Sequence, residues 1–161
     1  MLVAQNNLAT TYAKMGRREE ALQMDRDVYS ERLKLDGEED KETLGAAGNY
    51  ASSLYELQHF EEARSLLRKI TPAARHVFGE NNEFTLKMRK IFADSLYNDD
   101  DATLDDLREA VSTLEDSERI ARRVLGGAHP VTVGIEGRLG FARAALAARE
   151  TPSPDVSPGS V

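Results

Sequence analysis

Apolar and small residues recur along this chain with the spacing of one helical face. Leu8, Ala9 and Tyr12 form the first such group, and matching groups follow at intervals of about 42 residues. The later groups are Tyr50, Ala51 and Leu54, and then Phe92, Ala93 and Leu96. A second helical pattern follows each group, marked by Ala21, Met24 and Val28, by Ala63, Leu66 and Ile70, and by Ala110 and Leu114. The sequence therefore predicts helix pairs that repeat.

The breaks between the helix pairs share one pattern, a helix stop followed by a helix start. They read GEEDKETL at residues 37–44, GENNEFTL at 79–86 and GGAHPVTV at 126–133. The leading glycine allows the left-handed conformation that ends many helices. Asp40, Asn82 and His129 then stand where an N-cap belongs, and Pro130 suits the first helical position. Within the first pair, Gly16 is expected to reverse the chain between the two helices.

Alanines mark the positions where the two helices of a pair must approach closely. They are Ala9, Ala51 and Ala93 in the first helices, and Ala21, Ala63 and Ala110 in the second helices. One pair cannot bury its apolar faces alone, whereas stacked copies build a continuous core. We therefore expect an all-α fold, a right-handed α-solenoid of antiparallel helix hairpins. The array is predicted to cover residues 1–150, with units at about 2–44, 45–86 and 87–133 and a final helix at 130–149.

The stretch NNLATTYAKMGRREEAL, residues 6–22, resembles the tetratricopeptide repeat and is similar to the repeats of kinesin light chains. The positions that carry the resemblance are Leu8, Ala9, Tyr12, Gly16 and Ala21, together with the paired Asn6-Asn7, the lengthened period and HPVTV at 129–133. The resemblance covers about residues 2–150 and implies a scaffold of helix hairpins that binds other proteins. It weakens along the chain, because Gln58-His59 replaces the turn glycine in the second unit and the third unit carries the insertion NDDDATLDD.

Composition and charge exclude several classes of function. The chain has no cysteine, so it forms no disulfide and no thiolate zinc site. Its net charge is −7, and residues 98–118 contain nine acidic side chains and one basic side chain, which is opposite to the bias of nucleic-acid binders. No apolar run approaches the roughly 20 residues of a membrane span, and the first residues lack the features of a secretory signal. We expect no nucleic acid or membrane partner, and a cytoplasmic location.

Catalytic and cofactor-binding patterns are absent from the sequence. His59, His76 and His129 are far apart and lack companion ligands at metal spacing, and no P-loop or dinucleotide fingerprint occurs. The acidic insertion 98–106 lacks the central glycine and distal glutamate of a calcium loop. It is expected to be a solvated loop or a docking surface for a basic partner. The sequence thus predicts a protein that is not an enzyme and has no cofactor or metal.

Prolines mark two local irregularities. Pro72 lacks a backbone N–H and is expected to kink or break its helix near Lys69. After Glu150 the sequence becomes TPSPDVSPGSV, and residues 151–161 are predicted to form a disordered tail rich in proline and serine.

The first helices of stacked hairpins line the inner face of a solenoid, so their exposed sides predict a peptide-binding groove. The candidate residues are Asn6, Asn7, Thr10, Asn49, Ser52, Tyr55, Lys87, Lys90, Asp94 and Tyr97. An asparagine amide pairs with a peptide backbone through both its groups. Lys87 and Lys90 project from one helix face beside aromatic rings, which suits an acidic or C-terminal peptide.

These patterns favour a non-catalytic scaffold that binds an extended, acidic peptide of a protein partner in its concave groove. The alternative is a structural assembly unit, or a fragment of a longer array, that stacks end to end without a groove ligand. The first helix has no capped junction before it. An uncapped first helix would leave apolar surface available for self-association.

Overall fold

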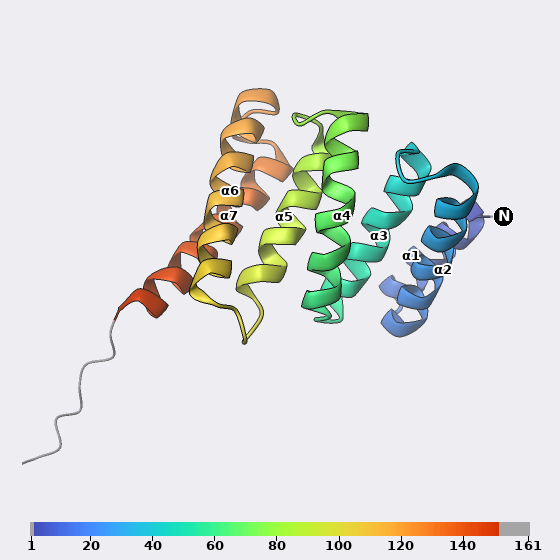
Figure 1. Ribbon diagram of the computed structural model, residues 1–161, viewed down its shortest axis with the longest axis horizontal. Helices are drawn as coiled ribbons and strands as arrows, with labels where there is room; N and C mark the ends of the chain where they lie inside the picture. Colours follow the sequence, from blue (N-terminus) through green and yellow to red (C-terminus); the bar gives the residue numbers. More distant parts are fainter. Residues whose placement is uncertain (1, 152–161) are drawn as a thin grey trace, which may run out of the picture.

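The computed structural model of this protein describes residues 2–151, apart from the side chains of Val3 and Asn6. This part of the chain forms seven α-helices and no strand, so the predicted all-α class is confirmed (Figure 1). The helices are α1 Leu2–Lys14, α2 Arg18–Asp36, α3 Lys41–Glu56, α4 Phe60–Phe78, α5 Glu83–Tyr97, α6 Leu104–Val124 and α7 Pro130–Glu150. Except for Thr151, the predicted tail lies outside the described residues.

The junction residues set the helix boundaries as the sequence predicts. Gly37 and Gly79, which follow α2 and α4, have φ angles of 86° and 92°. The Asp40 side chain accepts hydrogen bonds from the backbone N–H groups of Glu42 and Thr43 at the start of α3. The side chains of Asn82 and His129 accept one such bond each at the starts of α5 and α7. These bonds satisfy helix N–H groups that have no partner within the helix.

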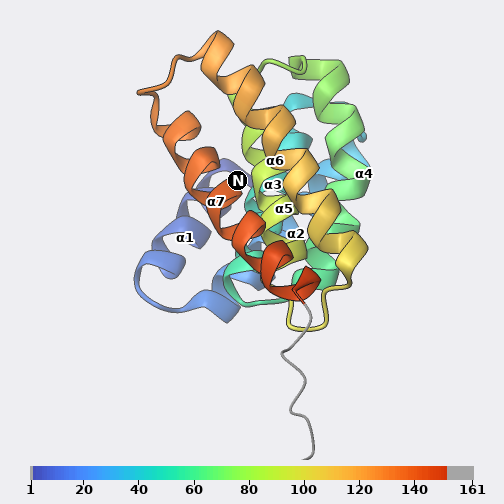
Figure 2. The ribbon, with the colours of Figure 1, turned by 90° about the vertical axis from the view of Figure 1, so that its left-hand side faces the viewer.

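The helices form the hairpins α1–α2, α3–α4 and α5–α6, and α7 packs against α6 and α5. Each second helix also packs against the first helix of the next hairpin, which aligns the hairpins in one row (Figure 1). Among the first helices, α5 also contacts both α3 and α7, whereas the second helices α2, α4 and α6 do not pack closely against one another. The row therefore bends with its first helices on the concave side. Figure 2 views the row along its length, with α1 and α7 on the opposite side from α4.

Alanine at the hairpin contacts is buried throughout the array. Ala51 and Ala63 are both 0% exposed, and their counterparts in the other two hairpins are equally covered. Larger side chains fill the spaces between hairpins and are also fully buried; they include Leu44, Leu54, Leu67, Leu86, Leu96, Leu114 and Ile135. The alternation of small residues at the close contacts with leucines between hairpins keeps the interior tightly packed.

A buried threonine recurs near the start of three of the first helices, although the apolar pattern of the sequence does not indicate it. Thr43, Thr85 and Thr132 are all buried. The Thr85 hydroxyl donates a hydrogen bond to the Gly79 carbonyl oxygen at 2.9 Å. This bond ties the beginning of α5 to the end of α4 and helps to fix the angle between successive hairpins.

Leu8 was predicted to lie on a packed face, but the structure exposes it. Its counterparts Tyr50 and Phe92 each meet the second helix of the preceding hairpin. Tyr50 packs against Tyr29 with ring centroids 6.1 Å apart, and Arg68 lies 5.4 Å from the centre of the Phe92 ring. No described helix precedes α1, so Leu8 has no such neighbour.

Pro72 does not interrupt its helix, so the expected break is wrong, and the kink near Lys69 stays a prediction. α4 continues from Phe60 to Phe78 with Pro72 inside it. Proline at this position removes the N–H that would bond to the Arg68 carbonyl. Pro72 is exposed, so water can reach that carbonyl and satisfy it.

The acidic insertion is anchored to the fold and is not simply a solvated loop. Asp99 accepts a 2.7 Å hydrogen bond from Arg64 of α4, and Ala102 is buried. Arg149 of α7 donates to the Ala102 carbonyl oxygen at 3.0 Å. Thr103 then caps α6 through a reciprocal pair of bonds with Asp106. The insertion therefore links α4, α6 and α7 at one edge of the array.

Replacing a buried hairpin alanine should destabilise the whole array. Ala51→Leu or Ala63→Leu should lower the free energy of unfolding by about 1–3 kcal/mol, because three extra carbon atoms overpack a contact without free space. Chemical denaturation measures the change, and Ala148→Leu at an exposed position of α7 is the matched control. An unfolding midpoint equal to that of the unsubstituted protein would contradict the close approach of α3 and α4.

Gln58 occupies the turn position at which the first hairpin has Gly16, and its φ angle is 62°. A side chain in this left-handed region costs about 1–2 kcal/mol, whereas glycine gains about 0.4–1 kcal/mol of unfolded-chain freedom. Gln58→Gly should therefore raise the free energy of unfolding by up to about 1 kcal/mol. Gln58→Val should lower it, since a branched side chain fits this conformation poorly. A thermal unfolding series tests the order Gly, Gln, Val, and any other order contradicts this explanation.

Candidate functional site

A cluster of polar side chains lies on the face formed by the first helices α3, α5 and α7. It consists of Tyr55 of α3, of Lys90, Asp94 and Tyr97 of α5, of Asn98 directly after α5, and of Arg138 of α7, and we call it the inner cluster. Lys90, Asp94 and Tyr97 share one face of α5 because they are spaced by four and three residues. The contacts of α5 with α3 and α7 bring the remaining members to that face.

Asp94 is the centre of the inner cluster and is 0% exposed. Its Oδ2 atom lies 3.3 Å from Lys90 Nζ and 3.5 Å from Arg138 Nε. Its Oδ1 atom has no hydrogen-bond partner among the described residues. Burial raises the pKa of Asp94 above its ordinary value, while the two cations act in the opposite direction. The two cations thus offset only part of the cost of burying this carboxyl group.

Two tyrosines flank Asp94. Asn98 Nδ2 donates to the Asp94 backbone carbonyl at 2.8 Å and lies 3.4 Å from the Tyr55 hydroxyl oxygen. The Tyr97 hydroxyl is buried near Asn98 and Arg138, but it makes no hydrogen bond of good geometry with a described residue. Burial, reinforced by the negative charge of Asp94, raises the pKa of Tyr97 to about 12. Tyr97 is therefore a neutral hydrogen-bond donor at physiological pH.

Lys90 and Arg138 cover Asp94 and remain partly exposed, with 24% and 39% of their side chains accessible. With Asp94 ionised, these three groups carry one net positive charge. Each cation has N–H donors beyond those that face Asp94. The cluster can therefore present donors to an anionic group from outside while the buried carboxyl group holds the cations in place.

The structure brings together four of the predicted groove residues, Tyr55, Lys90, Asp94 and Tyr97. Asp94 was expected on an exposed side, and the structure instead buries it beneath two cations. Lys87 is exposed and forms a 2.7 Å ion pair with Glu83 of the same helix. It therefore lies beside the cluster without belonging to it.

The remaining groove candidates lie on α1 and α3. Asn7, Thr10 and Asn49 are exposed, and Ser52 donates to the Gly48 carbonyl oxygen at 2.9 Å within its own helix. The Asn6 side chain lies outside the described residues. Gly48 itself is buried, because the ring of Phe84 packs against it.

Sequence analysis missed Asn98 and Arg138. Asn98 ends α5 and was counted with the acidic insertion. Arg138 lies in α7, for which the sequence pattern indicated no groove positions. Arg138 could have been identified by applying the repeat register of the first helices to α7 as well as to α5.

Within residues 2–151, no group of histidine and carboxylate side chains is arranged to hold a metal ion. The same described residues include no helix that is both long enough and apolar enough to cross a membrane.

Comparison with known proteins agrees with the repeat architecture. Residues 1–76 match the tetratricopeptide repeat family, while a search of curated proteins gave no significant match. The chain is similar to a Podosopora anserina structure described as a kinesin light chain with nearly identical TPR-like repeats, at 21% identity and a TM-score of 0.79, over 91% of this chain and 67% of that one. It is also similar to BtubC (BKLC) from P. vanneervenii, at 15% identity and a TM-score of 0.59, over 99% of this chain and 69% of the other. At these sequence identities, the similarity to the solved structures establishes a shared fold and nothing more.

The pH dependence of the unfolding free energy shows whether burial or ion pairing dominates the pKa of Asp94. Because burial raises the pKa of Asp94 above 3.8, the folded protein holds this proton more tightly than the unfolded chain. The contribution of Asp94 to stability should therefore fall as pH rises through the range between the two pKa values. We expect the unfolding free energy of the protein, minus that of Asp94→Asn, to decrease from acid to neutral pH. Urea denaturation at several pH values tests this, and an increase would mean that Lys90 and Arg138 outweigh burial.

Proposed function

We propose that this chain, which matches the tetratricopeptide repeat family over residues 1–76 and shares its fold with a kinesin light chain structure, binds an extended, acidic peptide on its concave face. The observation that carries the proposal is the inner cluster, in which two cations surround one buried carboxyl group. Tetratricopeptide repeats serve generally as protein-interaction scaffolds, and this cluster supplies the chemistry for an anionic ligand. The partner protein in this proposal is cytoplasmic.

A peptide carboxylate would approach the exposed sides of Lys90 and Arg138. Both cations are held by Asp94, so little side-chain freedom is lost when a ligand binds. Charge-assisted hydrogen bonds to a carboxylate are shorter and stronger than neutral ones. The rings of Tyr55 and Tyr97 lie beside these cations and offer apolar surface for an adjacent side chain of the ligand.

The rest of the peptide would extend over the first helices toward α1. Those helices carry the polar residues Asn7, Thr10, Asn49 and Ser52. The two asparagine amides among them matter most for a peptide backbone. An asparagine amide offers both a donor and an acceptor to an extended backbone. Lys87 lies at the side of the cluster, where it would attract acidic residues of the ligand at longer range.

End-to-end assembly is the alternative function, and one observation favours it. α7 exposes Val133 and Phe141, and Phe141 is 63% accessible. Another copy of the chain that packed against this side of α7 would remove the Phe141 ring from water, which favours association. Light scattering over a concentration series separates the two functions, because assembly predicts a mass that rises with concentration and falls with Phe141→Ser.

Selection from a random peptide display library tests peptide binding directly. Enriched peptides should be acidic, and their affinity should decrease with rising salt as exposed charges are screened. Arg138→Gln and Lys87→Glu should each weaken binding roughly threefold to fivefold, as expected for partly solvated charges. Lys34→Glu on α2 makes the same charge change on a second helix and is the matched control.

Two outcomes of the peptide selection would contradict binding at the inner cluster. Peptides that bind Arg138→Gln and Lys87→Glu as tightly as the unsubstituted protein would place the binding site elsewhere. The absence of any enriched peptide, together with concentration-dependent mass, would favour end-to-end assembly. Circular dichroism of each variant verifies that the helices remain.

A further inference from the structure

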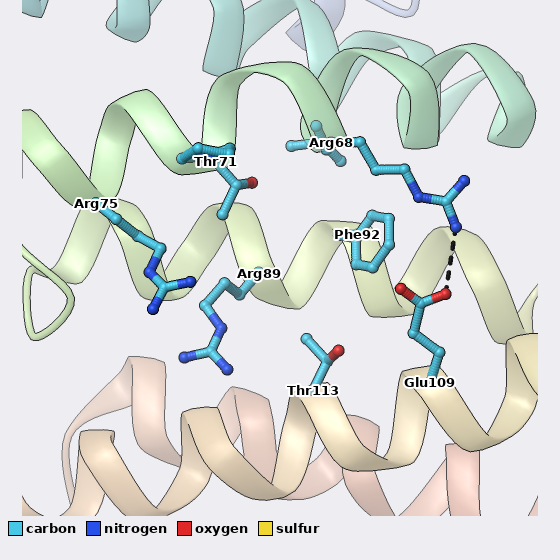
Figure 3. A pocket seen from close by; sticks show the side chains of 9 residues that line it. Arg68, Thr71, Arg75, Arg89, Phe92, Glu109 and Thr113 are labelled. Carbon is cyan, nitrogen blue, oxygen red and sulfur yellow. Dashed lines mark hydrogen bonds and ion pairs between the residues drawn. The ribbon is translucent and has the colours of Figure 1, made fainter.

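An arginine-lined cavity of about 280 Å³ opens on the convex side of the array. It lies between the second helices α4 and α6, and α5 forms its floor (Figure 3). Arg68, Thr71 and Arg75 of α4 line one wall at the spacing of a single helix face. Arg89 and Phe92 come from α5, and Glu109 and Thr113 come from α6. The cavity exists because α4 and α6 pack against α5 but not closely against each other.

Arg89 is the least satisfied charged group in this cavity. Its side chain is 14% exposed, and its nearest counter-charges, Glu80 and Asp116, lie 3.9 and 3.8 Å away. Its Nη1 atom is buried and has no hydrogen-bond partner among the described residues. A largely buried guanidinium with loose ion pairs and an unused buried donor is costly. An anion in the cavity would relieve that cost.

The other two arginines of the cavity have partners that can be displaced. Arg75 lies 2.9 Å from Glu80, and both side chains are about half exposed. Arg68 lies 3.2 Å from Glu109 and extends over the Phe92 ring. Exposed ion pairs of this kind contribute little to stability, so each arginine can turn to a stronger anion at small cost. In Figure 3, Arg75 and Arg89 extend into the same part of the opening, and Phe92 lies next to Arg68.

The donors point to a phosphate group more than to a carboxylate. The cavity is lined by three guanidinium groups and two threonine hydroxyls from three helices. This is more donors than the two oxygens of a carboxylate accept well. A phosphate monoester carries close to two negative charges and three strong acceptor oxygens. The planar fork of arginine matches phosphate oxygens in pairs. The cavity also continues over Phe92 and Leu67, which leaves room for carbon atoms attached to the phosphate.

We propose that this convex cavity binds a phosphorylated serine or threonine side chain of a partner peptide. The phosphate would displace the half-exposed Glu80 carboxylate, whose Oε1 atom faces both Arg75 and Arg89, and would lie between these two arginines with the Thr71 hydroxyl as an additional donor. The peptide chain would pass over Phe92 between Arg68 and Glu109. This site lies on the face opposite the inner cluster, so it does not depend on the concave groove.

A pair of peptide libraries tests the proposal, one with a fixed central phosphoserine and the other with serine at that position. The phosphoserine library should be enriched on the immobilised protein and the serine library should not. For an enriched peptide, fluorescence polarisation should show a loss of affinity of about tenfold in Arg75→Ala, because a charge-assisted pair is removed. Arg26→Ala, which removes the same charge from an exposed position of α2, should bind like the unsubstituted protein.

Two further measurements test whether binding needs the planar arginine side chain and whether it needs the peptide as well as the phosphate. Arg89→Lys keeps the positive charge but lacks the planar fork, so it should also weaken binding about tenfold while the circular dichroism spectrum stays unchanged. Inorganic phosphate should compete only at much higher concentration than the phosphopeptide.

Three results would each overturn the proposal. The first is equal enrichment of the serine library, or equal binding when glutamate replaces the phosphoserine. The second is parental affinity in both Arg75→Ala and Arg89→Lys. The third is competition by inorganic phosphate at the same concentration as the phosphopeptide, which would make the site a receptor for a small free anion.

Discussion

The close approach of two helices at buried alanines is the constraint on which the rest of this structure depends. At Ala51 and Ala63 no side-chain surface remains exposed, and the same is true of the matching pair Ala93 and Ala110. Small residues at such a contact let two helices pack at short distance, and leucines between hairpins then fill the interior. Each hairpin alone would leave those leucines in water. Stacking lets the repeats bury them, and it fixes how the helices are placed relative to one another.

The packing is unequal on the two sides of the array, and this inequality produces two different surfaces. On the inner side α5 contacts both α3 and α7, so polar residues of three helices meet around Asp94. On the outer side α4 and α6 remain apart, and the space between them becomes a cavity floored by Arg89 and Phe92. A cluster requires helices that touch and a cavity requires helices that do not. The curvature of one solenoid provides both.

Local features of the chain were predictable from sequence, whereas contacts between hairpins were not. Asp40, Asn82 and His129 could be identified as caps, because a cap acts on backbone groups two or three residues away. The burial of Asp94 could not, since it depends on Lys90 of its own helix and on Arg138 of another. The ion pair of Asp99 could not be predicted either, because its partner Arg64 comes from the previous hairpin. The position of Leu8 was misjudged for the same reason, because the register of a repeat does not reveal whether a neighbouring helix is present.

α5 connects the two proposed surfaces, because it supplies residues to both. Arg89 and Lys90 are consecutive, and neighbouring side chains on a helix point about 100° apart. One therefore faces the outer cavity while the other reaches Asp94 on the inner side. Ala93 and Leu96, both fully buried, fix the rotation of α5 about its own axis. A substitution on one face leaves the other in place as long as these two residues stay packed. The two surfaces can thus be altered independently, although a single helix carries the central residues of each.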